Sequence, residues 1–116
     1  MKIFNLKNFL ALFLLIVCGI PMSAQKVYKV DYESQADIKV YIVDYESQAD
    51  LCVYYVEYES QANKPGLWYK VEYESQANKK IFFEEYESQA DLKIYIVKYE
   101  SQAGWKNDSK SHLLDN

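Results

Sequence analysis

The chain contains few of the residues that usually build hairpin turns, disulfide frameworks and catalytic or zinc sites. Its 116 residues include three glycines, two cysteines and one histidine. Gly19, Gly66 and Gly104 are too few to supply glycine-dependent turns throughout a repeated hairpin fold. His112 lies near the C-terminus, which disfavours a catalytic triad or a zinc site. We therefore expect no catalytic, metal-binding or cofactor-binding residues, and a protein that is not an enzyme.

Residues 1–24 have the features of a secretory signal peptide. Lys2 and Lys7 precede an uncharged, largely apolar run that ends in the small residues Ser23 and Ala24. The run is shorter than the roughly 20 residues that a membrane-spanning helix needs. We predict cleavage after Ala24, a periplasmic or secreted protein, and no membrane span in the mature chain. Lipidation at Cys18 is the less favoured alternative, because the preceding valine is larger than the residue usual there.

The predicted mature chain has no arginine and carries 11 lysines against 17 acidic residues, for a formal charge of -6 (11 minus 17). This acidic balance disfavours nucleic acid as a partner. Cys52 is the only cysteine left after cleavage, so no intrachain disulfide can form. It replaces a lysine found at the same point of four other repeat units, which predicts a surface or rim position. An exposed thiol there could join two chains, so a homodimer remains open.

The most informative pattern is the sequence Tyr-Glu-Ser-Gln-Ala, which occurs six times. The six tyrosines are separated by 13, 13, 15, 13 and 13 residues, and they are Tyr32, Tyr45, Tyr58, Tyr73, Tyr86 and Tyr99. Such regular spacing is typical of a repeat protein with one short structural unit per copy. We predict a six-repeat β domain over residues 25–105 and a disordered tail over residues 106–116.

Each unit has the pattern of one strand followed by one turn. An aromatic residue lies four positions before each motif tyrosine, and a valine lies two positions before it in five of the six units. Alternation of apolar residues with period two is typical of a half-buried strand. This pattern predicts that the motif tyrosines of all six units share one interior.

A strand that simply continued for 13 residues would place successive motif tyrosines on opposite faces, so each unit must reset the phase. Serine, asparagine and aspartate bind nearby backbone groups, which places this break in the Ser-Gln-Ala segment and the residue after it. Because the Ser-Gln-Ala segments contain no glycine, we expect a wide bend or a short helical turn. The alanines are expected to pack inward.

The length of the unit limits the arrangement of the strands. A seven-residue strand covers about 23 Å, whereas the other six residues reach only about 20 Å when fully extended. A unit therefore cannot easily return to start a parallel neighbour. Antiparallel strands, or strands that cross a closed body, fit better. We predict an all-β fold, a compact closed array of six short strands from 13-residue repeats, since closure also removes exposed edges.

The unit Val-Asp-Tyr-Glu-Ser-Gln-Ala-Asp, present at residues 30–37 and 43–50, resembles that of small bacterial proteins of unknown function grouped as the Septknot family. The resemblance covers residues 26–105 and includes the closing Ser-Gln-Ala-Gly-Trp at residues 101–105. It implies short strands threaded into a sevenfold torus knot. It implies no activity.

The copies differ most in the fourth and fifth units. A loop at residues 63–66 lengthens the fourth unit, which also carries Trp68 in place of valine or isoleucine, and Glu84 replaces the valine of the fifth unit. A binding patch is one interpretation. We favour the alternative in which the loop absorbs a geometric mismatch and Glu84 marks a chain crossing or an edge. Paired acids such as Asp31 with Glu33 are expected to be solvated rather than to bind a cation.

These features predict an exported, non-enzymatic structural or interaction module whose partner is an unidentified protein or a component of the cell envelope. Two alternatives remain open. A secreted, curli-like fibre former is one, although its stacked acidic positions would repel. A glycan-binding module around Trp68 and Trp105 is the other.

Overall fold

The computed structural model describes residues 25–115, so the predicted signal peptide and Cys18 lie outside the described residues. Each repeat unit contains one short strand, and each motif forms one turn of 3₁₀ helix. The strands are β1 (Gln25–Lys29), β2 (Ile38–Ile42), β3 (Leu51–Tyr55), β4 (Leu67–Lys70), β5 (Lys79–Phe83), β6 (Leu92–Ile96) and β7 (Gly104–Trp105). The 3₁₀ helices are η1 (Glu33–Gln35), η2 (Glu46–Gln48), η3 (Glu59–Gln61), η4 (Glu74–Gln76), η5 (Glu87–Gln89), η6 (Glu100–Gln102) and η7 (Asp108–Leu114). The expected short helical turn in each motif is confirmed.

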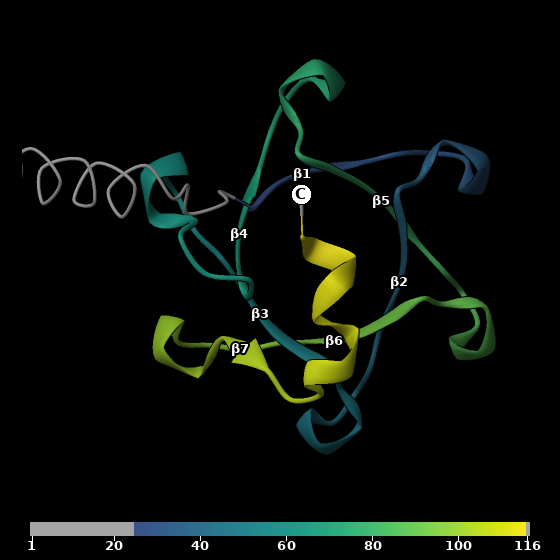
Figure 1. Cartoon of the computed structure of the whole chain (residues 1–116), viewed down its shortest axis with the longest axis vertical. Helices are drawn as coiled ribbons and strands as arrows, with labels where there is room; N and C mark the ends of the chain where they lie inside the picture. The colour runs from purple at the N-terminus through teal and green to yellow at the C-terminus, as the bar shows by residue number, and fades with distance from the viewer. Residues whose placement is uncertain (1–24, 116) are drawn as a thin grey trace, which may run out of the picture.

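Six strands form a closed barrel in the order β1, β5, β2, β6, β3 and β4, with β4 pairing back onto β1. Figure 1 shows this ring with the six motif turns projecting from it as lobes. The predicted all-β, closed array of six strands is confirmed. Closure pairs the backbone of each barrel strand on both sides, which removes the free edges that promote aggregation.

All pairings within the barrel are parallel, so the antiparallel option is wrong. The length limit applies only to strands that are consecutive in sequence. Most neighbours in the ring come from units three or four apart, as in the pairs β1 with β5 and β5 with β2. Each unit crosses the body instead of returning to its own start, which was the other option drawn from the length of the unit.

The connection from β3 to β4 is the exception, because these consecutive strands pair directly. They share two aligned positions, Tyr54 with Leu67 and Tyr55 with Trp68, and the two-residue insertion lies between them. Gly66 ends that loop at a close approach, where a Cβ atom would lie 2.5 Å from the Gly104 nitrogen and 2.5 Å from the Cys52 carbonyl oxygen. The loop therefore accommodates β7, which runs antiparallel to β3.

The barrel interior is filled from the strand phase opposite to the one predicted. Side chains five positions before each motif tyrosine are at most 5% exposed, and they are Val27, Val40, Val53, Trp68, Ile81 and Ile94. The aromatic residues one position later are only half-buried on the other face. An alternation with period two is consistent with either set of side chains facing the barrel interior, so the sequence pattern does not decide between them. A barrel of six strands encloses little space, which favours aliphatic side chains inside it and the aromatic residues outside.

The motif tyrosines do not share an interior, and this prediction is wrong. Their side chains are 64–67% exposed. The strands end three residues before the motif tyrosine, so the alternation that would carry the tyrosine inward has already stopped. Each tyrosine instead has extended backbone and forms the N-cap of a 3₁₀ turn that projects from the barrel. The alanines are buried at Ala49 and Ala62 and half-buried in the other four units.

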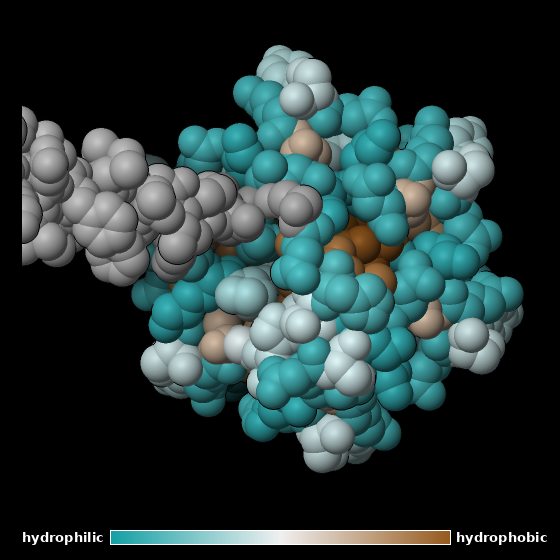
Figure 2. Space-filling model, viewed as in Figure 1, coloured by the Kyte–Doolittle hydropathy of each residue, from teal (hydrophilic) through white to brown (hydrophobic). Residues whose placement is uncertain are grey.

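The tail was predicted to be disordered, but in the structure it forms η7 and lies over one end of the barrel (Figure 1). Leu114 is 3% exposed within the core cluster, and Leu113 and Trp105 pack against that cluster. In Figure 2 the hydrophilic lobes surround a small hydrophobic area beside η7. Two leucines suffice because the barrel end offers them a concave apolar surface that sequence alone does not reveal.

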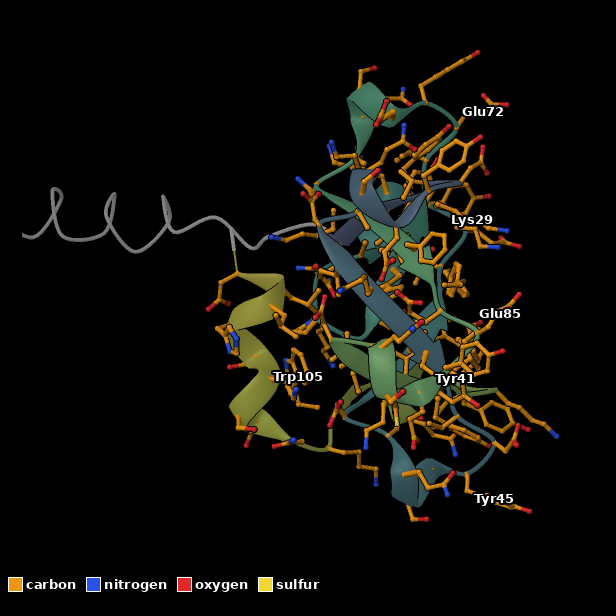
Figure 3. The ribbon with its side chains drawn as sticks, turned by 90° about the vertical axis from the view of Figure 1, so that its right-hand side faces the viewer. Lys29, Tyr41, Tyr45, Glu72, Glu85 and Trp105 are labelled. Carbon is orange, nitrogen blue, oxygen red and sulfur yellow. The ribbon has the colours of Figure 1, made fainter. Side chains whose placement is uncertain are left out.

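The tail covers the amino ends of the strands. Lys79 begins β5, and its Nζ donates to the Asp115 carbonyl at 3.0 Å. The Asp50 carbonyl, just before β3, accepts from the amides of Lys106 at 2.8 Å and Asn107 at 3.0 Å. The carboxyl ends of the strands therefore face the other side. Lys29 and Glu85 lie on that side in Figure 3, opposite Trp105.

Candidate interaction surfaces

The repeated motif builds the same turn six times. In each copy the glutamine amide donates to the tyrosine carbonyl at 3.0–3.1 Å, and the alanine amide donates to the glutamate carbonyl. In three copies the glutamine side chain also caps the turn. One example is Gln61, whose Oε1 accepts from the Tyr58 amide at 3.1 Å. Glutamine therefore has a local structural role in the motif.

Four of the six motif glutamates form ion pairs with lysine. Lys26 Nζ lies 3.2 Å from Glu59, and Lys39 Nζ lies 3.6 Å from Glu33. Lys106 makes the shortest pair, 2.8 Å from Glu46, and this contact raises the pKa of Lys106. All these side chains are substantially exposed, so each pair stabilises the fold by at most about 1 kcal/mol.

The motif tyrosine has no such local role. The six side chains form an exposed set that we call the tyrosine surface, made of Tyr32, Tyr45, Tyr58, Tyr73, Tyr86 and Tyr99. Tyr45 points away from the η7 side of the molecule in Figure 3. The residue before each tyrosine is exposed and acidic in five units and lysine in the sixth. The result is an aromatic and acidic surface repeated around the barrel.

Most of the acidic residues and the single histidine are exposed, whereas Asp50 is buried. Within residues 25–115, no three histidine, cysteine, aspartate or glutamate side chains lie close enough together to hold a metal ion. Asp31 and Glu33 are both exposed. His112 is exposed in η7, with Nδ1 3.2 Å from the Ser109 carbonyl oxygen. The structure thus brings none of these residues into one site.

Cys52 is buried, so the predicted surface or rim position is wrong. Only 1% of its surface is exposed, because β7 covers this part of β3 and pairs Gly104 with Cys52. In the other units no such strand lies over the equivalent lysine. Burial raises the pKa of the thiol, the Glu46 carboxylate raises it further, and Lys106 lowers it. A buried, protonated thiol is unreactive and is poorly placed to join two chains.

Trp68 is part of the core, which contradicts its proposed role as a sugar platform. Its ring has no exposed surface, and its Nε1 donates to the Pro65 carbonyl at 2.7 Å. The inserted loop therefore supplies the hydrogen-bond acceptor that a buried indole needs. Trp105 is half-buried and packs on the core beside Leu114. Stacking on a sugar requires an exposed ring face, which Trp68 lacks.

Glu84 replaces a valine that is buried in four of the other five units, and it keeps the backbone contact of that position. Its amide donates to the Val40 carbonyl at 2.8 Å, as the equivalent valines do to the neighbouring strand. Its Oε2 atom is buried without a hydrogen-bond partner among the described residues. Burial and then the adjacent Glu33 raise the pKa of the Glu84 carboxyl. Glu84 follows the end of β5 inside the closed ring, so it does not mark an edge.

One strand position varies in composition between the copies. It lies three residues before the motif tyrosine and holds Lys29, Ile42, Tyr55, Lys70, Phe83 and Ile96. Each of these residues ends its strand. Together they surround the open mouth at the carboxyl ends of the strands. The change of charge and aromaticity at this position between copies was the available signal in the sequence.

A model of the family described as the 7(1) septoil knot domain matches residues 24–106. The chain belongs to the Septknot family. The match spans all six repeat units together with β7, and it agrees with the resemblance carried by the repeated motif. The interlaced order of the strands is therefore the order of a Septknot domain. No curated protein and no solved structure matches the chain significantly.

Proposed function

We propose that this Septknot domain acts outside the cytoplasm as a non-enzymatic interaction module, and that it contacts its partner through the tyrosine surface. The single observation that carries the proposal is the exposure of six identical tyrosines at 64–67% each. Core positions vary between the copies, whereas these exposed residues do not. The turn itself is built by glutamine and backbone groups, and four of the six motif glutamates pair with lysine. Packing and turn formation therefore leave the tyrosines unexplained.

Exposed tyrosine is well suited to recognition. Its ring offers a large apolar area at a low entropy cost, and its hydroxyl adds a hydrogen bond. Six copies around one rim would allow several weak contacts to act together. The partner we propose is an envelope protein or another exported protein, contacted through the lobes. A second copy of this chain is a possible partner of the same kind.

Site-specific photocrosslinking in cells tests this proposal. A photoreactive phenylalanine derivative replaces Tyr45 in one variant and His112, which is exposed on the opposite side, in the control. We expect discrete adducts from position 45 and none from position 112. An adduct of twice the chain mass would identify a second copy as the partner. Absence of adducts from Tyr32, Tyr45 and Tyr86 alike would contradict the proposal.

Export is tested separately by the mass of the protein recovered from the periplasm and the medium. Cleavage after Ala24 yields a chain that begins at Gln25. A lipid-modified chain that begins at Cys18 would instead establish the lipoprotein alternative. In the part of the chain that the structure describes, no helix combines the length and apolarity needed to cross a membrane.

The two alternative functions gain no specific support. Fibre growth by strand addition needs unpaired strand edges, and the barrel strands are already paired around the ring. Sugar binding around Trp68 is incompatible with the burial of that ring.

A further inference from the structure

The mouth at the carboxyl ends of the strands is not uniform. Its six terminal strand residues, read in spatial order around the ring from β3 through β4, β1, β5 and β2 to β6, are Tyr55, Lys70, Lys29, Phe83, Ile42 and Ile96. Residues from the third, fourth, first and fifth units thus come together on one side. This side carries both lysines and both aromatic rings. The other side carries two isoleucines.

A cavity of about 210 Å³ opens on the side with the lysines. Its walls include Val27 and Ile81 from the barrel interior and Phe83 at the rim, together with the two lysines and Tyr55. Burial of Val27 and Ile81 at 5% and 1% exposure makes the floor apolar and rigid. Barrel mouths and pockets of this composition are common ligand sites.

The two lysines have no carboxylate partners. Ion pairs within residues 25–115 use Lys26, Lys39, Lys80 and Lys106, and neither Lys29 nor Lys70 takes part in one. Instead the Lys70 ammonium lies 4.6 Å from the centre of the Tyr55 ring. That ring is itself fixed edge-on against Trp68, with centroids 6.2 Å apart. Lys70 is therefore held over the cavity by a rigid aromatic pair.

Lys29 and Lys70 are also close neighbours, because β1 and β4 pair in parallel with Lys70 opposite Val27. Lys29 is two residues further along the same face of β1. Two like charges at such a diagonal position repel each other, and a bound anion would relieve the repulsion. The Tyr55 hydroxyl adds a hydrogen-bond donor near Lys70. Burial raises the pKa of this hydroxyl, so it stays neutral.

We propose that this mouth is a binding site for a small carboxylic acid with an aromatic or short aliphatic body. The apolar body occupies the cavity over Val27, Ile81 and Phe83, and the carboxylate lies between the ammonium groups of Lys29 and Lys70. An apolar cavity of roughly 150 Å³ holds benzene, so this one takes a ring with a short side chain. Pockets for drug-sized ligands measure roughly 300–1,000 Å³, so this smaller cavity favours a smaller ligand. Binding at this mouth does not depend on the tyrosine surface or on export.

Calorimetric titration with 3-phenylpropionate and with 3-phenylpropan-1-ol tests the site, since the two probes differ in charge and hardly in shape. We expect the acid to bind at least about tenfold more tightly than the alcohol, which corresponds to about 1.4 kcal/mol. The double variant Lys29→Met with Lys70→Met should lose this preference, so that it binds the acid no more tightly than the alcohol. Nuclear Overhauser contacts from the probe ring to the Val27 and Ile81 methyl groups should locate it in the cavity.

The matched control is the double variant Lys64→Met with Lys98→Met. It removes the same charge from two exposed lysines outside the cavity, so it should bind both probes as the unchanged protein does. Because all four lysines are exposed or half-exposed, their replacement should leave the fold intact, which circular dichroism checks. Equal binding of acid and alcohol, equal losses in the two double variants, or no saturable binding of the acid would each overturn the proposal.

Discussion

Asp50 and Lys93 are joined by two hydrogen bonds although they lie 43 residues apart. The Asp50 amide donates to the Lys93 carbonyl at 2.8 Å, and the Lys93 amide donates to Asp50 Oδ2 at 2.9 Å. The equivalent two hydrogen bonds join three further pairs of residues, which are Asp37 with Lys80, Asn78 with Lys26 and Asp91 with Lys39. In four of the six units, the residue that follows the motif thus binds a strand from a distant unit. It acts as a clamp between units.

Replacement of Asp50 by alanine should lower the free energy of unfolding by about 1–3 kcal/mol, because a backbone amide loses its acceptor in a partly buried place. Replacement by asparagine should cost less. Asn78 shows that an amide oxygen can accept the same bond, from the Lys26 amide at 3.1 Å. Urea unfolding measures both changes. The control is Asp44→Ala, at an exposed acid of the same unit, and an equal midpoint for the two alanine variants would disprove the clamp.

Removal of the Leu114 side chain tests the docking of the tail. Leu114 is 3% exposed in the core cluster, so Leu114→Ala should destabilise the protein by about 2–5 kcal/mol. The exposed neighbour His112 should tolerate alanine with a change of about 0.5 kcal/mol or less. Thermal unfolding of the two variants compares them directly. Equal stabilities would mean that the tail does not contribute to the core.

Burial of Cys52 predicts a thiol that is slow to react. At pH 8 the native protein should react with Ellman's reagent far more slowly than the protein in urea, because the thiol is 1% exposed and its pKa is raised. A matched control moves the cysteine to the half-exposed equivalent position in β2, as Lys39→Cys in a Cys52→Ala background. That variant should react quickly without urea. Rapid reaction of native Cys52 would show that β7 does not cover it.

The regular spacing of the motif predicted closure, one strand per unit and the helical turn, because these depend on local residues and on the repeat length. The set of alternating side chains that fills the barrel interior was not predictable in the same way. Val40 and Tyr41 alternate equally well with their neighbours, and only the narrow ring decides which of them lies inside. The motif tyrosine was misplaced because the strand ends before it. The end of a strand depends on pairing with other units.

Contacts between distant units could not be found from the sequence. Lys29 and Lys70 lie 41 positions apart, and they become neighbours only because β1 pairs with β4. The docking of Leu113 and Leu114 was not predictable, since the surface that receives them exists only in the closed barrel. Cys52 was placed at the surface by comparison with lysines in other units, but β7 covers this one copy alone. The repeat units are therefore not equivalent in their surroundings, because β7 at the end of the array pairs with β3.

Glu84 provides a prediction about pH. Because its pKa in the folded protein is raised above the ordinary 4.5, the folded state binds a proton more tightly than the unfolded state. Stability from this group is therefore fully present below pH 4.5 and is lost as the pH rises through the folded pKa. Lys39 opposes the increase, whereas Glu33 and Asp91 add to it. Replacement of Glu84 by valine, the residue of the other five units, removes the ionisable group and should raise stability at pH 7.

The measurement is the difference in urea midpoint between Glu84→Val and the unchanged protein, taken from pH 4 to pH 8. The difference should be larger at pH 7 than at pH 4, because at low pH the unchanged protein carries a neutral carboxyl at this position. The control Glu85→Val alters the exposed acid next to it and should show no comparable increase with pH. A difference that is constant over the range would mean that Glu84 titrates normally. A lower midpoint for Glu84→Val at pH 7 would mean that the carboxylate stabilises this position of the barrel.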